Sequence, residues 1–135
     1  MTTAVDTNLL LDVLLPNPDF VEQSLGLLEA AAKDGPLVMS DLVYAELAAF
    51  FACKDELDGF LRESSIRRDS LSDGALFLAG RSWREYRSAG GQRDRIISDF
   101  LIGAHAQVQA GRLATRDRGF YRRYFRGLTI AEPGT

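Results

Sequence analysis

Four acidic residues, Asp6, Glu46, Asp99 and Asp117, have sequence surroundings that suit a metal-binding site. Asp6 and Asp117 each follow a short segment with the pattern of a buried strand, whereas Glu46 and Asp99 lie among apolar residues with helical patterns. A carboxylate in apolar packing is costly unless it is paired, protonated or bound to a cation. Carboxylate oxygens are the hard ligands that Mg²⁺ and Mn²⁺ prefer. We therefore predict that the four acids bind a divalent cation.

Two of these acids also have a structural interpretation. Asp6 and Asp117 precede predicted helices, where an aspartate often caps the free backbone N–H groups. Glu46 does not fit that role, because it lies about one turn into its helix. Its neighbours at i−4 and i+4 are Leu42 and Phe50, so the pattern places Glu46 on the face expected to meet the core. For the two aspartates both interpretations stay open.

The elements that must position these acids alternate along the chain. The pattern predicts strands at 2–5, 36–39, 65–71, 112–115 and 128–132, and helices at 8–15, 18–33, 41–52, 54–63, 73–88, 95–109 and 118–125. It also predicts Ser40 as the N-cap of the helix at 41–52 and a loop at 89–92. This alternation predicts a three-layer α/β/α fold with a central parallel sheet of four to five short strands. We expect one domain over residues 1–132 and a short tail at 133–135. Ligands of such folds bind beyond the carboxyl ends of the strands.

Composition and charge limit the possible functions. The chain is 46% hydrophobic and 26% charged, its apolar runs are too short to cross a bilayer, and its first residues lack a secretion signal. We therefore expect a cytoplasmic protein without a membrane partner, with Cys53 in the core. Residues 1–61 carry a net charge of −9 and residues 62–135 one of +6, with all 14 arginines in the second part. Overall acidity disfavours a protein that coats nucleic acid, although a local arginine-lined groove stays possible.

Four segments of the chain resemble the successive motifs of PIN-domain nucleases. They are VDTNLLLDVL at the start, SDLVYAEL around Glu46, DFLIGAHAQ from Asp99 and LATRDRGF around Asp117. Together they span nearly the whole chain in the order and spacing of that family. Among PIN proteins, a short single domain of this kind is similar to the VapC-type toxins of toxin–antitoxin pairs. The resemblance implies a Mg²⁺-dependent endoribonuclease, with Mn²⁺ as a possible substitute, that forms a homodimer and is held inactive by a cognate antitoxin.

The resemblance also assigns roles to residues. Asp6, Glu46, Asp99 and Asp117 match the four acids of the family and are expected to be both catalytic and metal-binding. Asn8 and Thr115 match two polar positions of the motifs, and we expect them to orient a carboxylate or a metal-bound water. One or two metal ions would activate water and neutralise phosphoryl charge. Sequence does not assign the acids individual roles or choose between one metal and two.

Other chemistries have less support. His105 lies on a different side of its helix from Asp99 and is expected to pack or form a hydrogen bond. A phosphoaspartate phosphatase would need paired aspartates after the first strand, where the chain has only Asp6. A PIN-type nuclease of RNA maturation or structured DNA stays an alternative. So does a catalytically silent PIN module that binds proteins.

Arginines are concentrated near the last acid. Six lie within residues 112–126, against one acid, Asp117. We predict that Arg116, Arg118 and Arg122 bind the RNA backbone, with Arg116 close enough to reach the scissile phosphate. A helix over 118–126 would place Arg118, Arg122 and Arg126 together and turn Phe120 and Tyr124 towards the core. The alternative is a solvated helix face.

The leucine-rich early helices at 8–15 and 18–33 suggest the binding surface for the antitoxin. The same leucines would also suit an ordinary core.

Overall fold

The computed structural model of the chain describes residues 1–90 and 97–132. Within these residues, five strands form one parallel sheet in the order β3-β2-β1-β4-β5. The strands are β1 (Thr3–Val5), β2 (Leu37–Ser40), β3 (Ile66–Asp69), β4 (Arg112–Ala114) and β5 (Ile130–Ala131). The helices are α1 (Thr7–Leu14), α2 (Val21–Asp34), α3 (Asp41–Ala48), α4 (Lys54–Glu63), α5 (Asp73–Ser88), α6 (Ile97–Gln109) and α7 (Arg118–Tyr124). The predicted α/β/α architecture is confirmed.

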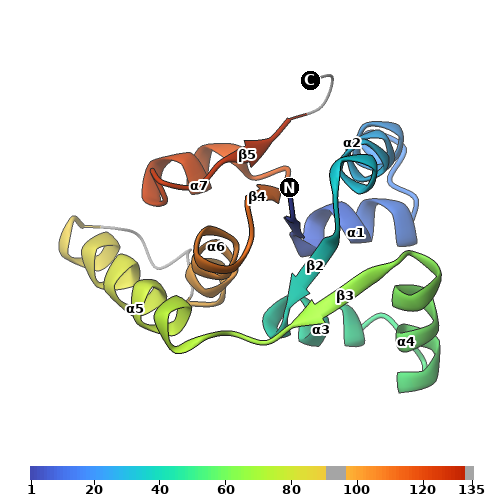
Figure 1. The fold of residues 1–135 in the computed structure, drawn as a ribbon, viewed down its shortest axis with the longest axis horizontal. Helices are drawn as coiled ribbons and strands as arrows, with labels where there is room; N and C mark the ends of the chain where they lie inside the picture. Colours follow the sequence, from blue (N-terminus) through green and yellow to red (C-terminus); the bar gives the residue numbers. More distant parts are fainter. Residues whose placement is uncertain (91–96, 133–135) are drawn as a thin grey trace.

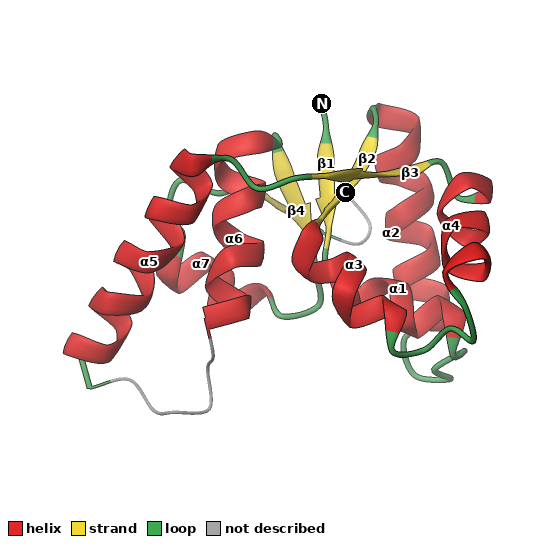
Figure 2. Cartoon of the chain, turned by 90° about the horizontal axis from the view of Figure 1, so that it is seen from below, coloured by secondary structure: helices red, strands yellow, loops and turns green. Residues whose placement is uncertain are grey.

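The sheet lies between two groups of helices. Figure 1 shows α5 and α6 on one side and α1 and α2 on the other, and Figure 2 shows the same separation from a second direction. The first strand occupies the centre, because Thr3 pairs with Leu37 of β2 on one side and with Arg112 of β4 on the other. The carboxyl end of β1 therefore lies between those of β2 and β4, so the segments that carry Asp6 after β1 and Asp117 after β4 lie side by side.

Local side-chain chemistry explains where several helices begin. The Ser40 hydroxyl accepts a hydrogen bond from the Val43 N–H at 3.4 Å, which confirms the predicted cap of α3. The second helix begins at Val21, three residues later than predicted, because the Asn17 side chain accepts a hydrogen bond from the Asp19 N–H and holds a turn. The third and seventh helices end earlier than predicted, at Ala48 and Tyr124.

An aromatic cluster joins α6 and α7. The ring of Phe100 packs against those of Phe120 and Phe125 at centroid distances of 5.2 and 6.1 Å. Gly103 makes this approach possible, since a Cβ there would lie 2.5 Å from a carbon of the Phe125 ring. A residue with a side chain would push α7 away from α6. The contact fixes the helix that follows Asp117.

Two predictions about single residues have different outcomes. His105 is 1% exposed and its Nε2 lies 2.9 Å from Asp69 Oδ2, which confirms that it forms a hydrogen bond. Cys53 is exposed, so its predicted place in the core is wrong. Cys53 lies in a bend between α3 and α4. The apolar residues on either side of it therefore do not form one face of a helix that could bury it.

Some predictions fall outside the described residues. The helix predicted from residue 95 is described from Ile97, and part of the loop around 89–92 and the tail at 133–135 lie outside. In residues 1–90 and 97–132 no helix has the length and apolar character needed to cross a membrane.

Candidate active site

The carboxyl edge of the sheet carries Asp6 and Asp117, as predicted. Asp6 follows β1, and its Oδ1 accepts a hydrogen bond from the Thr7 N–H at 2.8 Å, so it does cap α1. Asp117 precedes α7 but makes no side-chain capping bond. The capping interpretation therefore holds for Asp6 and is wrong for Asp117. Capping leaves Asp6 Oδ2 available for other partners.

The second oxygen of Asp6 is held by the two polar residues singled out from the sequence. The Thr115 hydroxyl donates a hydrogen bond to Asp6 Oδ2 at 2.7 Å, and Asn8 Nδ2 donates to the same oxygen at 3.4 Å. The Thr115 oxygen in turn accepts the Asp117 N–H at 3.0 Å. Asn8 and Thr115 thus connect the loops after β1 and β4. They fix the Asp6 carboxylate and the backbone of Asp117 relative to each other.

Glu46 reaches the same region from a different face than expected. Its side chain is exposed, and the buried residues of α3 are Val43 and Leu47. Phe50 is 51% exposed, so the predicted core-facing position of Glu46 is wrong. The Thr7 hydroxyl donates a hydrogen bond to Glu46 Oε1 at 2.8 Å. This bond places the Glu46 carboxylate beside the start of α1, next to Asp6.

Asp99 acts on Asp6 through its charge. It lies in the first turn of α6 and is half-buried. Burial raises the pKa of Asp6 to about 6; hydrogen bonds from Thr115 and Thr7 oppose this shift, and the charges of Glu46 and Asp99 add to it. Glu46 and Asp99 are therefore both close enough to Asp6 to repel its carboxylate.

Tyr121 was not predicted and lies among the acids. It is 1% exposed, and burial raises the pKa of its hydroxyl, as do the charges of Asp6, Asp99 and Asp117 and a hydrogen bond with Asp6. The phenol therefore stays protonated and donates to Asp6. Its position four residues after Asp117 was the available signal, but the predicted core face of the helix used Phe120 and Tyr124 instead. The buried residues of α7 are Phe120 and Tyr121.

The donor chemistry of this acid cluster (Asp6, Glu46, Asp99 and Asp117) fits a divalent cation. Its members are oxygen donors, and the repulsion at Asp6 is the unfavourable energy that a bound cation would remove. In the described part of the chain, no three or more Asp, Glu, His or Cys side chains already converge on one point as metal ligands. These residues therefore fit a divalent cation by their oxygen donors and by their closeness to one another. Their carboxylates would take up the final ligand positions when the cation binds.

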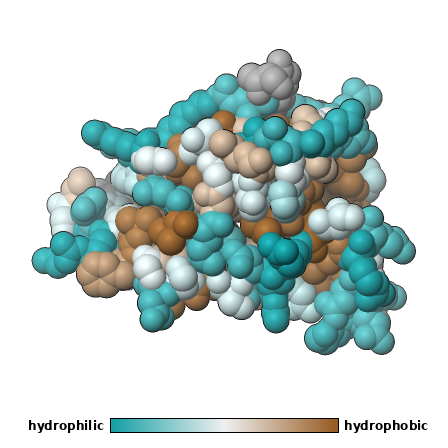
Figure 3. Space-filling model, in the orientation of Figure 1, coloured by the Kyte–Doolittle hydropathy of each residue, from teal (hydrophilic) through white to brown (hydrophobic). Residues whose placement is uncertain are grey.

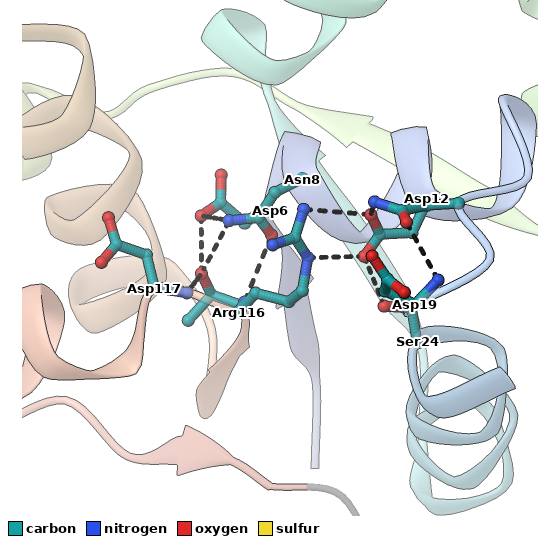
Figure 4. Close-up of polar contacts among 9 residues, drawn as sticks. Asp6, Asn8, Asp12, Asp19, Ser24, Arg116 and Asp117 are labelled. Atoms are coloured by element: carbon teal, nitrogen blue, oxygen red, sulfur yellow. Dashed lines mark hydrogen bonds and ion pairs between the residues drawn. The ribbon is translucent and has the colours of Figure 1, made fainter. Parts of the chain in front are cut away.

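Arg116 has a partner that the sequence did not indicate. Its Nε and Nη2 donate to the two carboxylate oxygens of Asp12 at 2.6 and 3.0 Å, and its guanidinium lies 4.2 Å from the centroid of the Phe20 ring. The Ser24 hydroxyl also donates to Asp12, at 2.6 Å. Figure 4 shows the Arg116 and Asp117 side chains pointing in opposite directions from adjacent backbone positions. In this structure the Arg116 guanidinium binds Asp12 instead of pointing to the acid cluster.

The other two predicted RNA-binding arginines both lie on α7, four residues apart, and have different surroundings. Arg122 is exposed and forms an ion pair with Glu132, whereas Arg118 is half-buried at the start of α7. The expected row of Arg118, Arg122 and Arg126 on one helix does not form, because α7 ends at Tyr124 and Arg126 lies beyond it.

Comparisons with known proteins agree with this geometry. The sequence profile of the PIN domain family matches residues 3–126. A chain of VapBC2 from Rickettsia felis, bound to a promoter DNA fragment, has 25% identity and a TM-score of 0.73, with 96% of this chain and 97% of that chain covered. VapBC-1 of nontypeable Haemophilus influenzae has 17% identity, a TM-score of 0.72 and 98% coverage of both chains. A toxin–antitoxin complex from Klebsiella pneumoniae has 18% identity and a TM-score of 0.64, covering 97% of this chain and 98% of that one. Comparison with curated proteins gives no match.

Proposed function

Because the chain belongs to the PIN domain family, we propose that it is a VapC-type toxin, a metal-dependent endoribonuclease of the cytoplasm. The observation that carries this proposal is the position of Asp6, which is buried at the carboxyl end of β1 with Glu46 held beside it by Thr7; burial raises its pKa, and the charges of Glu46 and Asp99 add to this shift. Such mutual repulsion reduces stability, and a divalent cation relieves it. The proposal is therefore that the acid cluster binds Mg²⁺, or Mn²⁺ in its place, and hydrolyses RNA.

The proposed roles follow from the contacts of each acid. Asp6, Asp99 and Asp117 would hold the cation, which lowers the pKa of water and neutralises phosphoryl charge when it is bound. Thr115 and Tyr121 both donate hydrogen bonds to Asp6 and so fix its carboxylate. A fixed carboxylate needs little reorganisation when charge develops nearby.

Glu46 has a different proposed role because it is exposed. Its carboxylate can ligate the cation or accept the proton of the attacking water, while the Thr7 hydroxyl holds its Oε1 at 2.8 Å. Hydrogen-bond reach to the attacking water is the geometric requirement for a general base.

A protein inhibitor and a second copy of the chain are the proposed partners. The similar structures from Rickettsia felis and Haemophilus influenzae are VapBC complexes, and that from Klebsiella pneumoniae is a toxin–antitoxin complex. Leu15 and Phe50 are 53% and 51% exposed near the early helices, and Phe77 of α5 is 69% exposed. Figure 3 shows apolar side chains at the surface in the region of α5. Exposed apolar surface of this kind is typical of protein interaction sites.

The test is to map RNA ends after brief induction of the wild type and of Asp99→Asn. We expect new ends at discrete positions with the wild type and none above background with Asp99→Asn. The control is Asp73→Asn, which changes an exposed acid in the first turn of α5 and should cleave like the wild type. The purified wild type should lose cleavage when the metal is chelated and regain it with Mg²⁺ or Mn²⁺.

The same experiment separates the alternatives. Cleavage of structured DNA but no RNA would favour a DNA nuclease. Cleavage restricted to precursor RNAs would favour a maturation enzyme. A wild type as inactive as Asp99→Asn on RNA and DNA would overturn the enzymatic proposal and favour a silent binding module.

A further inference from the structure

A cavity of about 440 Å³ lies between α5 and the segment formed by α7 and the residues after it. Its charged lining consists of Arg81 and Glu85 from α5, Arg123 from α7 and Arg126 from the residues after α7. None of these residues belongs to the acid cluster. We propose that this arginine cavity binds a backbone phosphate of single-stranded RNA together with the edge of a neighbouring base. This inference rests on the proposed ribonuclease function and names where the RNA is held.

The charges of the cavity favour an anion. Three guanidinium groups line it against one carboxylate, Glu85. Within residues 1–90 and 97–132, Arg81, Arg123 and Arg126 have no ion-pair partner, in contrast to Arg116 and Arg122. Guanidinium groups without a carboxylate partner retain their donors for phosphate oxygens.

Aromatic rings hold two of these guanidinium groups without using their donors. The Arg81 guanidinium carbon lies 5.6 Å from the centroid of the Phe77 ring, and that of Arg123 lies 5.4 Å from the centroid of the Tyr124 ring. A guanidinium above a ring uses its face for the contact, so its N–H groups can still bind an acceptor. Restricting both side chains in this way lowers the entropy that phosphate binding must overcome.

A second, independent feature points to a ligand with donors as well as a phosphate. Gln107 lines the same cavity, and its Oε1 is buried without a hydrogen-bond partner among the described residues. A buried acceptor without a donor is unfavourable, so a ligand that supplies a donor gains affinity there. Gly127 leaves room for this amide, since a Cβ there would lie 3.2 Å from Gln107 Nε2. An exocyclic amino group or ring N–H of a nucleobase would supply the missing donor.

The position of the cavity fits a single-stranded RNA that also passes the acid cluster. The seventh helix begins next to Asp117 and carries Arg123. Six residues of helix correspond to about 9 Å, a distance that a short single strand spans easily, since single-strand sites cover roughly 4–16 nucleotides. An acidic protein segment would also satisfy the arginines, but it would lack a base edge for Gln107. We therefore assign the cavity to RNA.

The test measures binding of a labelled single-stranded RNA of mixed sequence to Asp99→Asn protein at several salt concentrations. Adding Arg123→Ala and Arg126→Ala should lower the affinity about tenfold at moderate salt and reduce the salt slope by about 0.7, the value for one lost phosphate contact. Gln107→Leu should lower affinity for the RNA but leave its salt slope unchanged. The matched control adds Arg62→Ala and Arg67→Ala, which remove the same charge from a separate cavity beside Tyr44.

Each outcome decides between specific alternatives. Equal losses in the control pair would show a general charge effect and overturn the arginine cavity as the RNA site. Competition by a polyglutamate peptide as strong as that by unlabelled RNA would overturn the RNA assignment in favour of an acidic protein segment. If the wild type cleaves RNA while the Arg123→Ala/Arg126→Ala protein binds and cleaves equally well, this inference fails and the proposed function stands. If the wild type cleaves no RNA, the proposed function fails, whatever the cavity binds.

Discussion

Asp6 and Asp12 lie at the two ends of the same short helix, and both are buried. Their side chains are 5% and 2% exposed, so burial does not distinguish them. Asp12 accepts hydrogen bonds from Arg116 and Ser24, and the arginine supplies a full positive charge. Asp12 is therefore compensated by the protein itself.

The surroundings of Asp6 are of the opposite kind. Its hydrogen-bond donors are uncharged, namely the Thr7 N–H, the Thr115 hydroxyl, the Asn8 amide and the Tyr121 phenol. The nearby charges of Glu46 and Asp99 are negative and raise its pKa. A buried carboxylate with its own arginine stabilises the structure once it is folded, whereas one surrounded by other acids is suited to bind a cation from solution. What separates a structural acid from a binding acid here is the sign of the neighbouring charges.

Removing the arginine partner should have the largest effect on stability. We expect Arg116→Ala to lower the free energy of unfolding by about 3–5 kcal/mol, because Asp12 would be left as a buried charge without compensation. Urea denaturation of the metal-free protein measures this change. The control is Arg118→Ala, which removes an equally charged, half-buried side chain nearby.

A further variant separates the ion pair from packing. Replacing both partners, as Asp12→Leu with Arg116→Met, should recover most of the lost stability, because no unpaired charge remains. A loss in Arg116→Ala no larger than that in Arg118→Ala would mean that Asp12 does not depend on its arginine, and the contrast with Asp6 would disappear.

The second largest effect is a pH dependence that originates at Asp6. Its pKa is about 6 in the folded protein against 3.8 as the ordinary value, so the folded state binds more protons between these two pH values. Stability of the metal-free protein should therefore fall as pH rises from about 4 to 6 and level off above, by a total of about 2–3 kcal/mol from this group. Asp6→Asn should remove this part of the fall.

The measurement is the free energy of unfolding at pH 4, 5, 6 and 8 with the metal chelated. The difference between wild type and Asp6→Asn at each pH isolates the contribution of Asp6, since the other titrating groups are common to both proteins. A difference that stays constant from pH 4 to pH 8 would contradict the raised pKa.

The smallest predicted effect is a change in the stability of the metal-free protein, with opposite signs in the surroundings of Asp6 and of Asp12. Asp99→Asn should stabilise the metal-free protein at pH 8 by up to about 1 kcal/mol, because it removes a charge that repels Asp6. The same change at Asp12 should destabilise it, since Arg116 would lose its carboxylate. Thermal unfolding with and without Mg²⁺ adds a second readout: Mg²⁺ should raise the melting temperature of the wild type and not that of Asp99→Asn. Destabilisation by both substitutions would remove the distinction between the regions.

Most of the fold could be predicted because its signals are local. The alternation of strand and helix patterns follows from short-range periodicity, and the Ser40 cap of α3 follows from one side chain and the backbone beside it. The predicted helix at 54–63 agrees with α4 in both bounds. The start of α2 and the end of α3 were less accurate, because turn chemistry and tertiary packing decide where a helix begins and ends.

Two features of the candidate site could not be predicted from local sequence patterns, namely the buried face of α3 and the partner of Arg116. The third helix has apolar residues all round it, so periodicity did not show whether Leu42 and Phe50 or Val43 and Leu47 face the sheet. The pairing of Asp12 with Arg116 joins residues 104 positions apart. No local pattern reports such a contact, so the sequence did not indicate Asp12 as a partner, and RNA binding by Arg116 stays a prediction.

The central position of β1 in the sheet also limits the order in which the chain can fold. The Thr115 hydroxyl that holds Asp6 lies 109 residues further along the chain, and β1 has no partner on that side until β4 has been synthesised. Contacts between residues so distant in sequence form late, because the entropy of closing the chain must be overcome first. During synthesis, a nascent chain can pair β1 with β2 early but cannot complete the surroundings of Asp6. Assembly of the acid cluster is thereby coupled to translation of almost the entire domain.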